Sequence, residues 1–189
     1  MKKVLLLVLF IVPFLSAQIN TKGNISLVFN SEKINLPIST VSIQKDDGII
    51  LSIKAEKKDS IIQQMVTLEL GFKELSSKPD AETLEGTRID IITRNNTTNS
   101  GKELSIWFNN DQAGNEKNKS EAAYYGVFNK GEKVSWEINS VSMKVNIISV
   151  QYIDGALHII GECNGTFKST LAPEGQIAEI KDCKFEIII

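Results

Sequence analysis

Hydrophobic and polar residues alternate along most of the chain after residue 24. This period of two places successive side chains on opposite faces of a strand, so it predicts half-buried β-strands. No segment in this part of the chain has a sustained helical period. The apolar sets with the alternating spacing are Ile25, Leu27 and Phe29; Ile49, Leu51 and Ile53; Val66, Leu68, Leu70 and Phe72; Leu104, Ile106 and Phe108; Val134, Trp136 and Ile138; and Val141, Met143, Val145 and Ile147.

Two glycine-containing turns fix the register of two predicted hairpins. A three-residue loop at 46–48 (Asp-Asp-Gly) pairs Lys45 with Ile49 and Ile43 with Leu51, which places the apolar residues on one face. Gly48 then occupies the position that needs a left-handed backbone.

The second turn is the Asp-Gly pair at 154–155, which favours a type I′ turn because both central residues take positive φ there. It pairs Ile153 with Ala156 and Tyr152 with Leu157. Both hairpins join strands that are close in sequence, so they predict an antiparallel sheet.

Many strands with short connections predict an all-β fold, specifically an antiparallel β-sandwich. A lipocalin-like barrel is the alternative, and the continuous strand pattern from 141 to 171 would suit it. The alternation breaks at Ile147-Ile148, however, which predicts a bulge or a corner and favours the sandwich. The polar segments 73–85 and 109–120 are too short to separate domains, so residues 18–189 are predicted to form one domain.

The first 17 residues, MKKVLLLVLFIVPFLSA, read as a signal-peptide helix. Lys2 and Lys3 supply the positive end, residues 4–15 the apolar run, and Ala17 a small residue for cleavage. A membrane span needs about 20 apolar residues, so this run is too short. We therefore expect an exported protein, periplasmic or extracellular, with no membrane span after cleavage.

The charge distribution excludes one class of partner. The formal net charge is −2 and the acidic and basic residues are interspersed. Nucleic-acid binding needs a concentrated basic surface, so no nucleic-acid partner is expected.

The sequence shows no set of residues that predicts catalysis, a metal site or a cofactor. His158 is the single histidine, and one histidine cannot build a zinc site alone. The Asp-Gly register places it opposite Gln151, on the polar face of its hairpin. Phosphate-binding loops, dinucleotide motifs and a Gly-x-Ser-x-Gly sequence are absent, so we assign no catalytic or metal-binding residues.

Three aromatic residues form a candidate binding surface: Trp107, Tyr124 and Tyr125. Trp107 is out of phase with Leu104 and Ile106, so it is expected on the opposite face of its strand. An exposed tryptophan can serve as a binding platform, although packing at a core or an edge is the alternative.

The two cysteines, Cys163 and Cys183, both fall on the apolar parity of their predicted strands. A three-residue loop at 173–175 would pair Leu171 with Ile177 and leave the cysteines diagonal to one another. One bulge or a five-residue loop would place them directly opposite. Diagonal neighbours are slightly too far apart for a disulfide, whereas export and an even cysteine count favour one. We predict a disulfide, with two buried free thiols as the alternative; the spacing is not that of a redox or metal motif.

The C-terminal half resembles uncharacterised secreted proteins of Bacteroidetes-type bacteria. The residues that carry the resemblance are Gly165-Thr166-Phe167 and Lys181 to Phe185, and weaker similarity extends back to Leu84. Cys183 stands where that pattern usually has glycine. The resemblance implies an exported β-sandwich and transfers no functional residue.

The function predicted from the sequence is a non-catalytic exported β-domain that binds a ligand, a glycan or a protein partner. Two alternatives remain open. A secreted hydrolase could act with carboxylates alone, since the chain has 23 acidic residues. A barrel could instead carry an apolar ligand.

Overall fold

The computed structural model describes residues 22–45, 48–72, 84–109, 120–173 and 175–189. The predicted signal peptide and most of the two long polar segments lie outside the described residues. Within them the chain forms eleven strands: β1 (Lys22–Phe29), β2 (Glu32–Lys45), β3 (Ile49–Lys58), β4 (Ile62–Phe72), β5 (Leu84–Asn95), β6 (Ser100–Asn109), β7 (Ser120–Asn129), β8 (Glu132–Glu137), β9 (Ser140–Ile153), β10 (Ala156–Lys168) and β11 (Gln176–Ile188).

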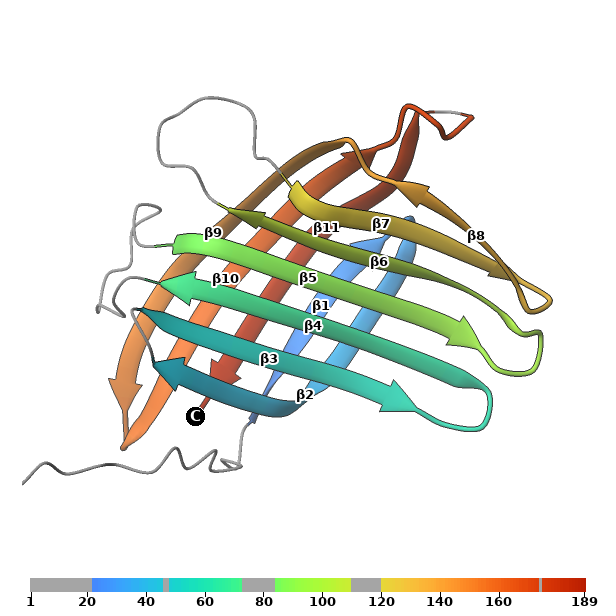
Figure 1. Ribbon diagram of the computed structural model, residues 1–189. Helices are drawn as coiled ribbons and strands as arrows, with labels where there is room; N and C mark the ends of the chain where they lie inside the picture. The colour runs from blue at the N-terminus through green and yellow to red at the C-terminus, as the bar shows by residue number, and fades with distance from the viewer. Residues whose placement is uncertain (1–21, 46–47, 73–83, 110–119, 174) are drawn as a thin grey trace, which may run out of the picture.

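These strands make one continuous antiparallel sheet in the order β8-β7-β6-β5-β4-β3-β2-β1-β11-β10-β9. The long strand β2 belongs to both halves of the sheet. It pairs with β1 through Glu32–Pro37 and with β3 from Ile38 onward. The sheet turns along this strand into a half-barrel, so that β3 to β7 cross in front of β1, β9, β10 and β11 (Figure 1).

The predicted all-β antiparallel class is therefore confirmed. The finer prediction of a sandwich is not confirmed, because a sandwich has two separate sheets and here β2 is hydrogen-bonded into both halves. The described part of the chain contains no helix that is long and apolar enough to cross a membrane.

The core lies on the inner face of the curled sheet. Phe29, Phe72, Phe167 and Phe185 are among its largest fully buried side chains. Burying a side chain of this kind contributes about 1.5–3 kcal/mol. The alternation in the sequence thus reports one buried inner face and one solvated outer face.

Both Gly-turn registers predicted from the sequence are confirmed. In β2 and β3, Lys45 pairs with Ile49 and Ile43 with Leu51. In β9 and β10, Ile153 pairs with Ala156. The φ angles of Asp154 and Gly155 are 51° and 82°, as a type I′ turn requires.

The break in alternation at Ile147-Ile148 is a bulge, as predicted. Gly161 of β10 pairs with Ile147, and the preceding residue Ile160 pairs with Ser149, so Ile148 is the extra residue. Because of this extra residue, odd-numbered residues of β9 such as Val141 and Met143 face the core before the bulge, and the even-numbered Val150 faces it afterwards.

The predicted register of the closing hairpin is wrong. Phe167 pairs with Ala178 and Lys168 with Gln176, so the connection is longer than three residues. Ser169 donates its N–H to the Gly175 carbonyl at 2.7 Å, which closes this longer loop. Leu171, which the sequence pattern paired with Ile177, lies in this loop instead, and its side chain is 74% exposed.

Candidate functional site

Trp107 of β6 and Tyr124 of β7 lie on the outer face of the sheet. Their side chains are 49% and 54% exposed. Trp107 pairs with Ala122, and Tyr124 pairs with Ser105. The two aromatic residues are thus diagonal neighbours on adjacent strands, a relationship in which such positions are about 7–8 Å apart.

Polar residues of β5 and β6 lie beside these rings. Arg88 pairs across the strands with Trp107, and Asp90 pairs with Ser105. Arg88 Nε donates to Asp90 Oδ2 at 2.9 Å, and the Ser105 hydroxyl donates to Asp90 Oδ1. We call Arg88, Asp90, Ser105, Trp107 and Tyr124 the outer aromatic surface.

The outer aromatic surface combines two exposed rings with polar groups that are hydrogen-bonded to one another. Asp90 accepts from Arg88 and from Ser105, which fixes the orientation of both donors. A guanidinium has five N–H donors, so Arg88 retains hydrogen-bonding capacity beyond its bond to Asp90. Aromatic faces next to oriented donors suit a ligand with apolar C–H faces and hydroxyl edges.

The third predicted aromatic residue, Tyr125, does not join this surface. It is 5% exposed and faces the core, since consecutive residues of a strand point to opposite faces. Its ring stacks on Trp136 with centroids 6.0 Å apart and meets Phe29 edge-on at 6.3 Å. Burial raises the pKa of Tyr125, and a hydrogen bond from Asn30 partly opposes that rise.

Asn30 has a structural role that the sequence pattern did not predict. Its φ is 46°, and its Nδ2 donates to the Tyr125 hydroxyl at 3.0 Å and to the Ile177 carbonyl at 3.1 Å. Its Oδ1 accepts the N–H of Glu179 at 2.7 Å. The signal in the sequence is Asn30-Ser31 between two alternating segments, which is turn chemistry and gives no indication of contacts to β7 and β11.

Cys163 and Cys183 pair directly across β10 and β11 in the core. The register shifts just beyond Cys163, so a bulge brings the cysteines opposite each other. At this bulge Asn164 Oδ1 accepts the N–H of Asp182, whose φ is 50°. The direct pairing therefore comes from a loop longer than the predicted one together with two register shifts, at 163–165 and at 167–168, and not from one bulge in the predicted hairpin.

Both thiols are free in the structure. The hydrogen bond with Cys183, followed by desolvation, raises the pKa of the Cys163 thiol well above its ordinary value. A thiol is nucleophilic only as the thiolate, so Cys163 is poorly suited to act as a nucleophile. The disulfide stays a prediction.

The single histidine, His158, lies on the polar face of its hairpin. His158 pairs with Gln151, as predicted. Among the described residues, no cluster of three or more histidine, cysteine or acidic side chains could hold a metal ion.

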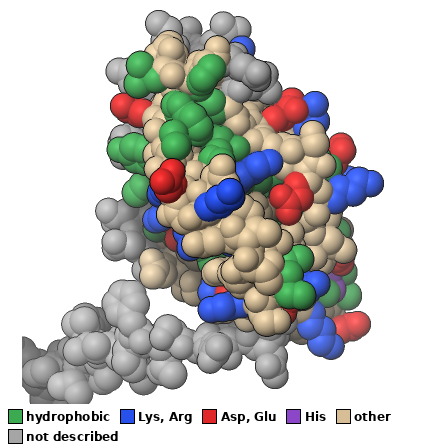
Figure 2. All heavy atoms as spheres, turned by 90° about the vertical axis from the view of Figure 1, so that its right-hand side faces the viewer, with side chains coloured by type: hydrophobic (Ala, Val, Ile, Leu, Met, Phe, Trp, Pro, Cys, Tyr) green, Lys and Arg blue, Asp and Glu red, His purple; other side chains and the backbone are tan. Residues whose placement is uncertain are grey.

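Figure 2 views the end of the molecule that carries the β5–β6 and β7–β8 turns. Hydrophobic side chains gather in the upper part of this view, and charged side chains of both signs are scattered around and below them.

Comparison of the chain with protein-family models, with curated proteins and with solved structures found no match. The resemblance of the C-terminal half to secreted Bacteroidetes-type proteins is thus untested.

Proposed function

We propose that the protein is an exported, non-catalytic β-domain that binds a glycan on its outer aromatic surface. The observation that carries the proposal is the pair of exposed rings, Trp107 and Tyr124, side by side on one sheet face. Adjacent large apolar side chains exposed on a protein surface often mark an interaction site.

A glycan fits this surface better than a wholly apolar ligand. Sugar rings have C–H faces that pack on aromatic rings and hydroxyl groups around their edges. Arg88 and Ser105 are held by Asp90 beside Trp107 and Tyr124, where they can hydrogen-bond such hydroxyls. Core side chains pack together along most of the inner face of the half-barrel, which weakens the alternative of a barrel that carries a wholly apolar ligand.

Export is part of the proposal and rests on the sequence of residues 1–17. A glycan-binding domain of this kind would act in the periplasm or at the cell surface, where polysaccharides are accessible.

The test is a glycan array with the chain from residue 18, followed by calorimetric titration of the strongest ligand. We expect Trp107→Ala and Tyr124→Ala each to weaken binding at least about tenfold, since aromatic residues dominate binding energies. Tyr152→Ala is the matched control, because Tyr152 is also an exposed aromatic residue (75%) and lies on β9, at the other edge of the sheet.

Three outcomes would contradict the proposal. Binding to no glycan on the array is the first, and unchanged affinity in both aromatic variants is the second. Release of reducing ends from a polysaccharide panel is the third, because it would identify the protein as a hydrolase.

A further inference from the structure

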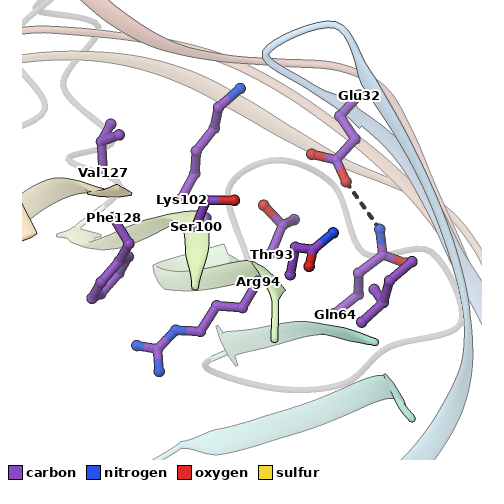
Figure 3. A pocket seen from close by; sticks show the side chains of 11 residues that line it. Glu32, Gln64, Thr93, Arg94, Ser100, Lys102, Val127 and Phe128 are labelled. Carbon is purple, nitrogen blue, oxygen red and sulfur yellow. Dashed lines mark hydrogen bonds between the residues drawn. The ribbon is translucent and has the colours of Figure 1, made fainter. Parts of the chain in front are cut away.

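A cavity of about 350 Å³ opens between the β1–β2 hairpin and the inner face of β4 to β7 (Figure 3). Its volume lies at the lower end of the range for small-molecule sites, about 300–1,000 Å³. The cavity is on the inner face of the sheet and the outer aromatic surface is on the other face, so this inference does not depend on glycan binding. The lining residues that matter here are Glu32, Ile62, Gln64, Thr93, Lys102 and Val127.

Two opposite charges line this cavity without pairing. Glu32 Oε1 accepts a hydrogen bond from Gln64 Nε2 at 3.1 Å, which leaves its second oxygen available. Within the described part of the chain, neither Glu32 nor Lys102 belongs to an ion pair. Figure 3 shows Lys102 pointing up from its strand and Glu32 reaching down from the β1–β2 hairpin toward Gln64, so the two charges come from separate walls of the cavity.

The other cation at the cavity, Arg94, is already engaged elsewhere. Arg94 and Phe128 point away from Lys102 in Figure 3. The Arg94 guanidinium lies 4.4 Å from the centre of the Phe128 ring and 3.5 Å from Glu103 Oε2. The charges that face the cavity are therefore one ammonium group and one carboxylate.

We infer that this cavity binds a small zwitterion, an α-amino acid or a dipeptide with an aliphatic side chain. The ligand carboxylate binds Lys102 and its ammonium group binds Glu32. The aliphatic side chain packs against Ile62 and Val127, and the Thr93 hydroxyl and the Gln64 amide add hydrogen-bonding groups near the charged ends.

Charge complementarity favours this class over the alternatives. A simple anion would satisfy Lys102 but approach the Glu32 carboxylate, and a simple cation would do the reverse. A neutral ligand would displace water from both charged groups without replacing their partners, which costs free energy. A molecule with two separated opposite charges satisfies both.

Calorimetric titration tests the inference with a panel of free aliphatic amino acids and dipeptides, together with N-acetylated and C-amidated forms of the best ligand. We expect binding of a free zwitterion and at least tenfold weaker binding of either blocked form. Lys102→Met should weaken the free ligand about as much as amidation does, and it should not further weaken the amidated form. Glu32→Gln should weaken binding of the free ligand about as much as acetylation does, and it should not further weaken binding of the acetylated form.

Lys144→Met is the matched control, because Lys144 is an exposed lysine of β9 far from the cavity. The inference is overturned if no member of the panel binds at millimolar concentration, or if the blocked ligands bind the wild-type protein as well as the free one. The second comparison needs no variant, so it stays decisive even if a substitution impairs folding.

Discussion

The Asn30 amide donates a 3.0 Å hydrogen bond to the Tyr125 hydroxyl, linking residues that are 95 positions apart. Asn30 follows β1 in one half of the curled sheet, and Tyr125 lies in β7 of the other half. This contact therefore joins the two halves through side chains, in addition to the continuous backbone pairing through β2.

Replacing Asn30 with glycine should lower the free energy of unfolding by about 2–3 kcal/mol. Glycine tolerates the positive φ, so the loss reports the three side-chain hydrogen bonds, at about 1 kcal/mol each. Tyr125→Phe removes only one of them and should cost about 1 kcal/mol. Urea unfolding measures both values, and equal losses in the two variants would show that the bonds to Ile177 and Glu179 contribute nothing.

Replacing Gly161 with alanine should destabilise the protein by about 1–3 kcal/mol, the usual cost of overpacking a core. An added Cβ would overlap the ring of Phe185, which lies across the ladder from Gly161. Gly71→Ala is the matched control: it is also a strand glycine, and its added Cβ would have no neighbour closer than 3.6 Å. Similar thermal midpoints for the two variants would contradict this account.

Asp59 should make the β3–β4 turn sensitive to acid. Its Oδ1 accepts the N–H groups of Ile61 and Ile62 at 2.8 and 2.7 Å, and these backbone bonds, led by Ile62, lower the pKa of the carboxyl group. A lowered folded-state pKa gives stability that is present above the unfolded pKa, about 3.9, and is lost as pH falls through the folded value. Asp59→Asn keeps an oxygen that can accept these hydrogen bonds, and it should lose less stability than the wild type does between pH 5 and pH 2. Asp59→Ala has no such oxygen, so its thermal midpoint should be lower than that of the wild type at both pH values. Identical acid responses in the wild type and Asp59→Asn would refute the assignment.

Mild oxidation should join Cys163 and Cys183 without moving the strands, because the cysteines already face each other. The closed loop of about 20 residues should add roughly 3 kcal/mol to the free energy of unfolding on the chain-entropy model. Intact-mass measurement with and without alkylation detects the bond. Two alkylatable thiols in the unfolded, oxidised protein would show that it does not form.

The reduced protein should lose stability at alkaline pH. The raised pKa of Cys163 means that the thiol ionises more readily in the unfolded chain, with a pKa of about 8.5. Stability is therefore complete below that pH and falls as pH rises from there toward the folded pKa. The double variant Cys163→Ala/Cys183→Ala should lack this decline in stability. Chemical unfolding of both proteins at pH 7 and pH 10 makes the comparison. A decline of the same size in the double variant would show that other ionisable groups cause it.

The sequence is most informative where a turn and a two-residue period act together. The Asp-Gly turn at 154–155 and the loop at 46–48 fix their registers locally, because shifting a strand by one residue would turn its apolar side chains to solvent. Those two hairpins and the exposed face of Trp107 could therefore be predicted from the residue pattern alone.

The features that sequence reasoning missed depend on contacts between distant segments. The sequence left the Cys163–Cys183 register open, because that register depends on the length of the 169–175 loop and on a bulge at which Asn164 bonds across the strands to Asp182. Lys102 and Glu32 likewise line one cavity only because the sheet curls and brings the start of β2 over β6. Sequence spacing contains no information on that approach.

The pairing of β1 with β11 sets an order of events during folding. Residue 22 is hydrogen-bonded alongside residue 188, so β1 has only β2 as a partner until β11 has been synthesised. Sheets that depend on such non-local pairing fold slowly. Under the export that we propose, slow folding would leave the polypeptide unfolded while it crosses a membrane, and the sheet would be completed on the far side.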